Sequence, residues 1–333
     1  MQTRWQEYLW RGVPPWFLVV CFIPLFGAVP IYGQEARFPS KPIEVIVPYP
    51  PGGIIDIGTR VIGESLSKEL KVPVIIKNMP GAGGLTGSTA FLSTKPDGYT
   101  LLSACAGAVI STVLLSKTPP FDPRKDLLPV GYVADSPVSM AVAKASPFRS
   151  FDDFLTFAKN NPGKLAGGVA NLGAEEHFML MAIIKDTGIK TKLVPFGSGG
   201  PLITALLGGH VDWITSSLPR TISYERSGDL RILLLTRPSK ELPEIPSCRD
   251  KGLTSATINI WSGFLLLPQT PKAAYDRLVS ALEVVSKTPE VSNKLSSAGF
   301  NIEYKNLREF SNLIKDQWEM LSRIIEDTGM KVN

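Results

Sequence analysis

Cysteine and histidine, two residue types that often carry catalysis, are few in this sequence and widely separated. Cys105 follows an expected strand and could act as a nucleophile at the start of a helix, where the helix dipole lowers the pKa of a thiol. His177 and Asp212 are its conceivable partners, but neither histidine of the chain is flanked by a pattern of base and orienting group. A G-x-S-x-G nucleophile elbow is also missing from the sequence. We therefore predict that the protein is not an enzyme, and keep a Cys105-dependent hydrolase as an alternative.

Metal ions and cofactors are not expected either. The only histidines are His177 and His210, and the sequence has no C-x-x-C pair, so the ligand types of a zinc site are missing. Downstream of residue 33 the cysteines are Cys105 and Cys248, and their spacing leaves open whether they form a disulfide. The segment 81–84 lacks the third glycine of a dinucleotide fingerprint, and no glycine loop ends in Gly-Lys-Ser/Thr.

The sequence instead predicts anion sites made by the backbone. A β-branched strand at 43–47 stops at Pro50-Pro51-Gly52-Gly53, and apolar residues then follow at helical spacing over 54–70. Such a turn leaves the first N–H groups of the helix unpaired at the positive end of its dipole. An anion can bind there without any cationic side chain. Further glycine loops follow strands at 81–84, 170–173 and 197–200, and several such loops in one chain favour a ligand site over simple turns.

Strands and helices are expected to alternate along the chain. The predicted strands are 43–47, 74–77, 100–104, 130–133, 140–144, 166–169, 192–194, 212–215, 231–236 and 258–267. The predicted helices are 54–70, 86–94, 151–160, 175–187, 200–207, 273–287 and 307–327. Alternation of this kind predicts parallel sheets covered by helices on both faces, with ligands at the carboxyl ends of the strands.

The first 33 residues have the character of an export signal. Arg4 and Arg11 form a basic start, and the apolar run 16–28 is short and is interrupted by Pro24. Gly33 supplies a small residue at a cleavage position, although the third residue back is not small, so an uncleaved N-terminal anchor stays the alternative. Removal of the segment lowers the net charge from +5 to +4, since it carries two Arg and one Glu. The remaining chain suffices for two lobes, and with no Lys/Arg tract nucleic acid is not an expected partner.

Several motifs, taken together, resemble those of one receptor family. They are Pro48-Tyr49-Pro50-Pro51-Gly52-Gly53 with Asp56 and Arg60, Asn78 to Gly84 with Gly87, Pro96 to Leu102, Val194-Pro195-Phe196, Leu207-Gly208-Gly209 with Val211-Asp212, and Trp261-Ser262-Gly263. In this order they resemble the Bug-type, TctC-like extracytoplasmic solute receptors of tripartite tricarboxylate transporters. The likeness covers essentially all of the chain after the signal.

The resemblance implies an α/β, two-lobed periplasmic binding protein fold of type II, each lobe a sheet flanked by helices with a cleft between. Strands near 138–144 and 258–267 would cross between the lobes. Residues 37–138 and 262–333 would form lobe one and residues 139–261 lobe two. The resemblance also implies a periplasmic location for the exported chain.

The implied function is the capture of a small carboxylate-containing ligand in the cleft, mainly by backbone N–H groups of the glycine loops and by ordered water. The ligand would pass to the membrane permease subunits of a tripartite tricarboxylate transporter, and the receptor would be a monomer. A receptor that feeds a membrane sensor kinase is the alternative. Two or three charged hydrogen bonds of about 1.5–3 kcal/mol each would support roughly micromolar binding.

The residues predicted to bind the ligand stand on these loops or near them. They are Tyr49, Pro51, Gly52, Gly53, Asp56, Cys105, Ala106, Gly173, Ala174, Glu175, Ser198, Gly199, Ser216 and Trp261. For Asp56 we favour a cap on the first-turn N–H groups of its own helix, with Arg60 as an ion-pair partner at i,i+4, over contact with a ligand hydroxyl or amine. Trp261 could line the pocket or belong to the core, and both readings stay open.

Lobe two departs from the family pattern in ways that bear on specificity. Small hydroxyl residues usual before His177 are missing, and Gly197 to Gly200 stand where a basic residue is common. Lobe two would thus have lost a hydroxyl donor and a cation and gained an acid, Glu175. We hypothesise that Glu175 projects into the cleft and disfavours di- and tricarboxylates relative to a monocarboxylate, an amino acid or another zwitterion. Alternatively Glu175 caps its helix with its side chain in solvent, and His177 is expected to pack at the helix start.

Overall fold

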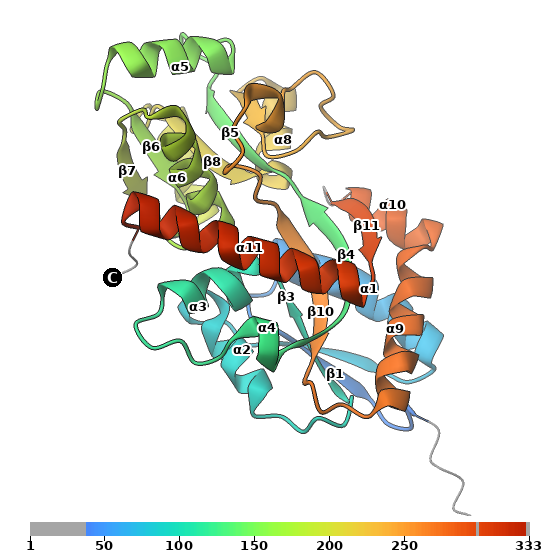
Figure 1. The fold of residues 1–333 in the computed structure, drawn as a ribbon. Coiled ribbons are helices and arrows are strands. Elements are labelled where there is room, and N and C mark those ends of the chain that lie inside the picture. Colours follow the sequence, from blue (N-terminus) through green and yellow to red (C-terminus); the bar gives the residue numbers. More distant parts are fainter. Residues whose placement is uncertain (1–37, 298–299, 331–333) are drawn as a thin grey trace, which may run out of the picture. The chain divides into compact units, whose positions relative to one another are not determined.

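The structure is a computed structural model that describes residues 38–297 and 300–330 (Figure 1). By internal contacts the chain divides into Met1–Ala36 and Arg37–Asn333, and the described residues belong to the second unit. The predicted export signal, residues 1–33, lies outside the described residues. Within the described ranges, no helix is both long enough and apolar enough to cross a membrane.

A six-stranded mixed sheet organises what we call lobe one. Its strand order is β11-β4-β10-β3-β1-β2. The strands are β1 (Ile43–Val47), β2 (Val74–Asn78), β3 (Thr100–Ala104), β4 (Leu128–Ser136), β10 (Ile260–Leu266) and β11 (Asn301–Lys305). β1 pairs in parallel with β2 and β3, whereas β10 is antiparallel to β3 and β4. The expected all-parallel sheet is therefore wrong, because β10 comes back from the other lobe and enters the sheet in the opposite direction.

Helices cover both faces of this sheet. They are α1 (Ile54–Leu70), α2 (Leu85–Leu92), α3 (Thr112–Leu115), α4 (Pro123–Asp126), α9 (Lys272–Ser286), α10 (Pro289–Ser297) and α11 (Leu307–Thr328), with the short turns η1 (Ala82–Gly84) and η2 (Gly107–Ser111). Successive side chains of a strand point to opposite faces. Accordingly Leu101 of β3 joins the apolar cluster under α1 and α9, and Leu102 joins the cluster that includes residues of α2 and α11.

A five-stranded sheet organises lobe two, in the order β7-β6-β8-β5-β9. Its strands are β5 (Val138–Ala143), β6 (Ala166–Val169), β7 (Lys192–Pro195), β8 (Trp213–Ser217) and β9 (Leu230–Leu235). Its helices are α5 (Phe151–Asn160), α6 (Glu175–Thr187), α7 (Gly199–Leu207) and α8 (Leu218–Ser227), and the short turn η3 (Arg249–Lys251) follows β9. β6 is parallel to β7 and β8, and β5 is antiparallel to β8 and β9.

The chain passes between the two sheets twice. β4 of the first sheet continues into β5 of the second with Pro137 between them, and β10 re-enters the first sheet after β9 of the second. Near the middle of Figure 1 these connections run side by side from one sheet to the other. The two-lobed α/β fold that the resemblance implied is confirmed, since each sheet carries its own flanking helices.

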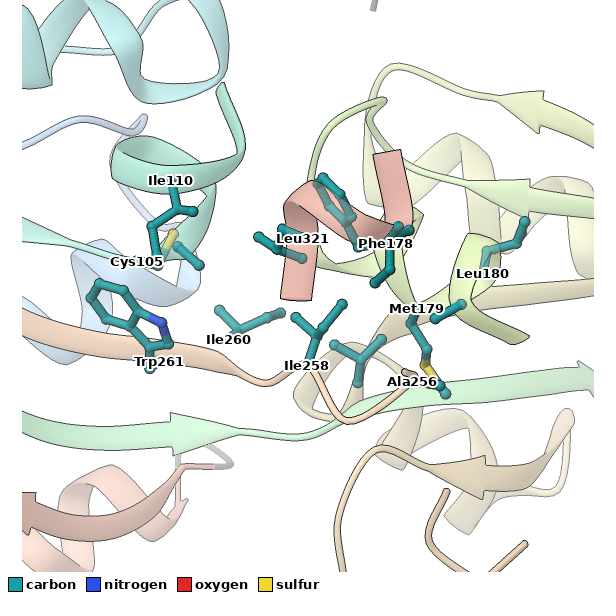
Figure 2. Close-up of a cluster of buried hydrophobic side chains, with 14 of the residues drawn as sticks. Cys105, Ile110, Phe178, Met179, Leu180, Ala256, Ile258, Ile260, Trp261 and Leu321 are labelled. Atoms are coloured by element: carbon teal, nitrogen blue, oxygen red, sulfur yellow. The ribbon is translucent and has the colours of Figure 1, made fainter. Parts of the chain in front are cut away.

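The C-terminal helix α11 packs on both lobes. It contacts β4, η2 and α4 of lobe one and α6 of lobe two. Near its start Phe310 meets the ring of Trp261 edge to face, with ring centroids 5.0 Å apart, and near its end Asp327 pairs with Lys185 of α6 at 2.6 Å. Figure 2 shows side chains of one buried apolar cluster to which both lobes contribute, among them Trp261, Leu321 and Phe178. The lobes are thus joined by a shared core as well as by strands.

Candidate functional site

A cavity of about 700 Å³ lies between the lobes. Lobe one lines it with the β1–α1 loop, the turn at 80–84 and residues around Cys105. Lobe two lines it with the loop before α6, the loop before α7 and Arg220 of α8. The predicted site residues that line the cavity are Tyr49, Pro51, Gly52, Gly53, Cys105, Gly173, Ala174, Glu175, Ser198 and Gly199. The structure therefore brings all four predicted glycine loops to one place.

In lobe one the cavity meets the start of α1. Gly53 is the N-cap residue, with φ −73° and ψ 162°, and Ile54 and Ile55 of the first turn also line the cavity. A glycine has no side chain that could cap the helix, so the first-turn N–H groups are left for another acceptor. The 17-residue length of α1 adds the positive end of its dipole. This wall can hold an anion with backbone atoms alone.

Asp56 lies behind this loop and holds it in place. Its carboxylate accepts hydrogen bonds from the backbone N–H of Gly52 at 2.8 Å, from Nδ2 of Asn78 at 2.8 Å and from Nε of Arg60 at 3.0 Å. The ion pair with Arg60 was expected, but the cap is not on the first helical turn: the N–H that Asp56 binds precedes the helix. Burial acts to raise the pKa of this carboxyl, and the bonds from Arg60, Gly52 and Asn78 outweigh it and lower the pKa.

Tyr49 and Cys105 form a partly buried polar pair in the wall of the cavity. Oη of Tyr49 lies 3.1 Å from Sγ of Cys105. Burial, together with the charge of Glu175, raises the pKa of the Cys105 thiol well above its usual value. A nucleophilic cysteine needs the opposite shift. The environment expected for a Cys105-dependent hydrolase is therefore not found here.

Glu175 is the first residue of α6 and points into the cavity rather than into solvent. It is only 4% exposed, and its Oε1 accepts a hydrogen bond of 2.8 Å from the backbone N–H of Gly107 in η2. Since Gly107 belongs to lobe one, this bond crosses the cleft. Burial, with the neighbouring charge of Glu176, raises the pKa of Glu175 to about 7.

His177 stabilises the loop that precedes α6. Its Nδ1 accepts a hydrogen bond of 3.0 Å from the backbone N–H of Gly173, and the side chain is buried. Burial lowers its pKa to about 4, so the ring stays neutral at ordinary pH. The expected packing role of His177 at the helix start is confirmed.

Arg220 lines the cavity and was not among the predicted site residues. It lines the cavity from α8, its Nη1 donates to Oγ of Ser216 at 2.9 Å, and it lies 3.5 Å from the carboxylate of Glu176. Lobe two therefore does bring a cation to the cavity, from α8 rather than from the loop at 197–200. The guanidinium stands over Gly199, where an added Cβ would come within 2.5 Å of its Cζ. The glycine that seemed to replace a basic residue thus provides the space for Arg220.

A signal for α8 was present in the sequence. Ser217 is the N-cap residue of α8, and Pro219 is its second helical residue. Gly228 follows the last turn and has the left-handed conformation. A proline in the first turn and a glycine just past the last turn are typical helix boundaries. A helix starting at the carboxyl end of β8 would have placed Arg220 in its first turn, among the other loops of the cavity.

The remaining predicted residues lie behind the cavity wall. Ala106 and Ser216 are fully buried, and Ser216 acts on the cavity through Arg220. Trp261 is buried in the core, where its Nε1 donates to Oε1 of Gln317 at 2.6 Å. The structure supports the interpretation that Trp261 belongs to the core, because its side chain points toward α11.

The described residues contain no cluster of three or more side chains suited to a metal ion. Cys105 and Cys248 are both buried free thiols. The question left open by their spacing is thereby answered for the described part of the chain. What the cavity offers is a set of open helix N-termini, one guanidinium, and the two carboxylates Glu175 and Glu176.

Known proteins share this fold and much of this sequence. The family model described as "Tripartite tricarboxylate transporter family receptor" matches residues 59–330. The chain is 28% identical over 298 residues to Protein BugT of Bordetella pertussis, a match that covers 89% of this chain and 91% of that protein. A solved structure described as that of a periplasmic transporter is similar with a TM-score of 0.78 and 30% identity, over 89% of this chain and 100% of that one.

MatC from Rhodopseudomonas palustris, solved with bound malate, is a more distant match. Its TM-score is 0.72 at 23% identity, over 86% of this chain and 100% of MatC. At this identity the similarity concerns the fold.

Proposed function

Because the chain belongs to the tripartite tricarboxylate transporter receptor family, we propose that it binds a small carboxylate in the interlobe cavity and delivers it to the permease subunits of such a transporter. The family consists of solute-binding receptors, not enzymes. The observation that carries the proposal is the convergence of helix N-termini from both lobes, with Arg220, on one cavity.

The ligand contacts would come from both walls. In lobe one Ile54 and Ile55 of the first turn of α1 line the cavity and would offer their backbone N–H groups, and in lobe two Ser198 and Gly199 begin α7. Arg220 can add a charge-assisted hydrogen bond. Each hydrogen bond to the ligand carboxylate is worth about 1.5–3 kcal/mol and each helix end about 0.3–1 kcal/mol. A few of them offset the cost of association at about micromolar affinity.

The finer parts of the proposal concern location and partners. The receptor acts in the periplasm after export by residues 1–33, with the uncleaved anchor as the alternative for that segment. It acts as a monomer. The malate held by MatC is a carboxylate, which agrees with the ligand class proposed here. Delivery to a membrane sensor kinase is the second candidate, and genes for a pair of membrane subunits or for a kinase next to this one would distinguish the two.

Carboxylate binding is tested by comparing each acid with its primary amide. Thermal unfolding is followed with a panel of carboxylates, amino acids and aromatic acids, and hits are measured by titration calorimetry. A ligand at one hundred times its dissociation constant stabilises the fold by about 2.7 kcal/mol. We expect an acid to bind and its amide to bind at least 10-fold more weakly.

The role of Arg220 is tested in the same titrations. Arg220→Met removes the charge and should weaken the acid about 10- to 100-fold, as expected for a hydrogen bond to a charged group. Arg226→Met on the same helix removes a surface pair with Glu241 and should leave affinity unchanged. Equal binding of acid and amide would contradict the proposed function.

A further inference from the structure

The carboxylate of Glu175 occupies a formed binding position in lobe one. Besides accepting the N–H of Gly107, both of its oxygens lie close to that residue: a Cβ at position 107 would be 3.2 and 3.4 Å from them and 2.8 Å from Oη of Tyr49. A Cβ at position 107 would clash with Tyr49 and crowd the carboxyl group, so a glycine suits this close approach. Oη of Tyr49 in turn lies 3.1 Å from Sγ of Cys105, whose pKa is raised by burial and by the charge of Glu175. Gly107, with Tyr49 and Cys105 beside it, thus receives an acid group that comes from the opposite lobe.

We propose that Glu175 supplies an internal carboxyl group that fills one acid-binding position of lobe one, the position at Gly107, so that the ligand carries a single carboxylate. This inference rests on the proposed function and deepens it by naming the ligand class, monocarboxylates with amino acids included. Arg220 and the open N-termini of α1 and α7 then bind the single carboxylate of the ligand.

The charges around the cavity support a single ligand carboxylate. Glu175 and Glu176 both line the cavity from the start of α6, and Arg220, which lies beside Glu176, is the cation among the described lining residues. A second ligand carboxylate near α6 would lie close to Glu175 and Glu176. The guanidinium of Arg220 could not compensate for both, because it already pairs with Glu176. Like charges in a partly dehydrated cavity repel one another more strongly than in water. A hydroxyl, an amide or an ammonium group could instead donate to these carboxylates.

Space does not by itself exclude a second carboxylate. The cavity of about 700 Å³ is large enough for dicarboxylates. The protein must therefore distinguish monocarboxylates from dicarboxylates by charge and by the presence of Glu175 at the position beside Gly107. Specificity of this kind depends on a repulsive element as much as on attractive contacts.

The test compares ligands that differ by one terminal carboxyl group. Wild-type protein is titrated with butanoate and succinate, pentanoate and glutarate, hexanoate and adipate, and alanine and aspartate. We expect the monocarboxylate of the best-binding pair to bind at least 10-fold more tightly than its partner. Glu175→Ser empties the position at Gly107, and the preference should shift toward the dicarboxylate by at least 10-fold. Glu175→Gln removes the charge but keeps the position filled, so its shift should be smaller.

The outcomes separate this inference from the function on which it rests. A wild-type protein that binds dicarboxylates as tightly as monocarboxylates overturns the inference and leaves the carboxylate receptor intact, and this result needs no variant to fold. An unchanged preference in a folded Glu175→Ser protein overturns it as well. If the wild type binds neither member of any pair nor any other carboxylate, the proposed function itself is wrong.

Discussion

The two walls of the cavity recognise ligands by different means. Lobe one presents mostly backbone, from the loop before α1 and the turn at 80–84, while lobe two presents the charged side chains Glu175, Glu176 and Arg220. Backbone N–H groups bind any carboxylate in much the same way, because their geometry is set by the turn. Charged side chains change with single substitutions. The difference suggests that lobe one recognises the acid group that ligands have in common and lobe two selects among them.

The largest effect that tests this difference between the lobes is expected from the charge on Glu175. Its pKa is raised from 4.5 to about 7 in the folded protein, so the folded state holds this proton at pH values where the unfolded state has lost it. The stabilising contribution is complete below about pH 4.5 and is lost as the pH rises through 7. Glu175→Gln should match wild type near pH 4.5 and be more stable by about 3 kcal/mol above pH 7. Urea unfolding at a series of pH values measures this difference.

A second pH-dependent contribution to stability comes from His177, and it is the same in both proteins of that comparison. The lowered pKa of His177, about 4, makes stability rise with pH between about 4 and 6.5, the opposite direction. Because both proteins carry His177, the difference between wild type and Glu175→Gln isolates the carboxyl. A difference that does not vary with pH would mean that Glu175 is not held in a site that disfavours its charge.

The next largest effect is expected at Gly199. Gly199→Ala places a Cβ 2.5 Å from Cζ of Arg220 and should push the guanidinium out of the cavity, weakening carboxylate binding by about 10-fold or more. Gly200→Ala is the matched control, because a Cβ there meets open space within the described structure. Titration calorimetry of both variants measures the effect. Equal affinities would show that Arg220 does not hold the ligand.

The smallest effect should come from one backbone donor of lobe one. Ile54→Pro removes the N–H at the first position of α1, where proline is tolerated, and Gly53 already has the extended conformation that a following proline requires. Ile54→Ala keeps the N–H and loses the same side-chain packing. We expect Ile54→Pro to bind the carboxylate about 10-fold more weakly than Ile54→Ala. Equal affinities of Ile54→Pro and Ile54→Ala would show that the first N–H of α1 does not bind the ligand.

Much of the fold could be predicted because local signals mark its boundaries. The bounds of α1, α5 and α6 agree with the predicted 54–70, 151–160 and 175–187. The first follows a Pro-Gly turn, the second starts at the capping box of Ser150 and Asp153, and the third ends at a left-handed Gly188. Such signals act within a few residues and need no knowledge of the rest of the chain. By contrast α8, α10 and β11 were not predicted, although Pro219 and Gly228 mark the two ends of α8 in the sequence.

The candidate site was predictable in its loops but not in its side chains. The glycine loops stand at strand ends, where the topology of an α/β sheet collects them. Whether Trp261 faces the cavity or the core depends on α11, which is more than forty residues further along the chain. Arg220 reaches the cavity only because position 199 has no side chain, a relation between two helices that no local pattern records.

The helix α11 has a consequence for how the molecule responds to heat. Because its apolar face continues from Phe310 beside Trp261 to Leu321 near α6, melting either lobe would strip the other of part of its core. The protein should therefore melt as one cooperative unit, with matching calorimetric and van't Hoff enthalpies. A solute in the cleft then protects the whole chain, including helices that it never touches.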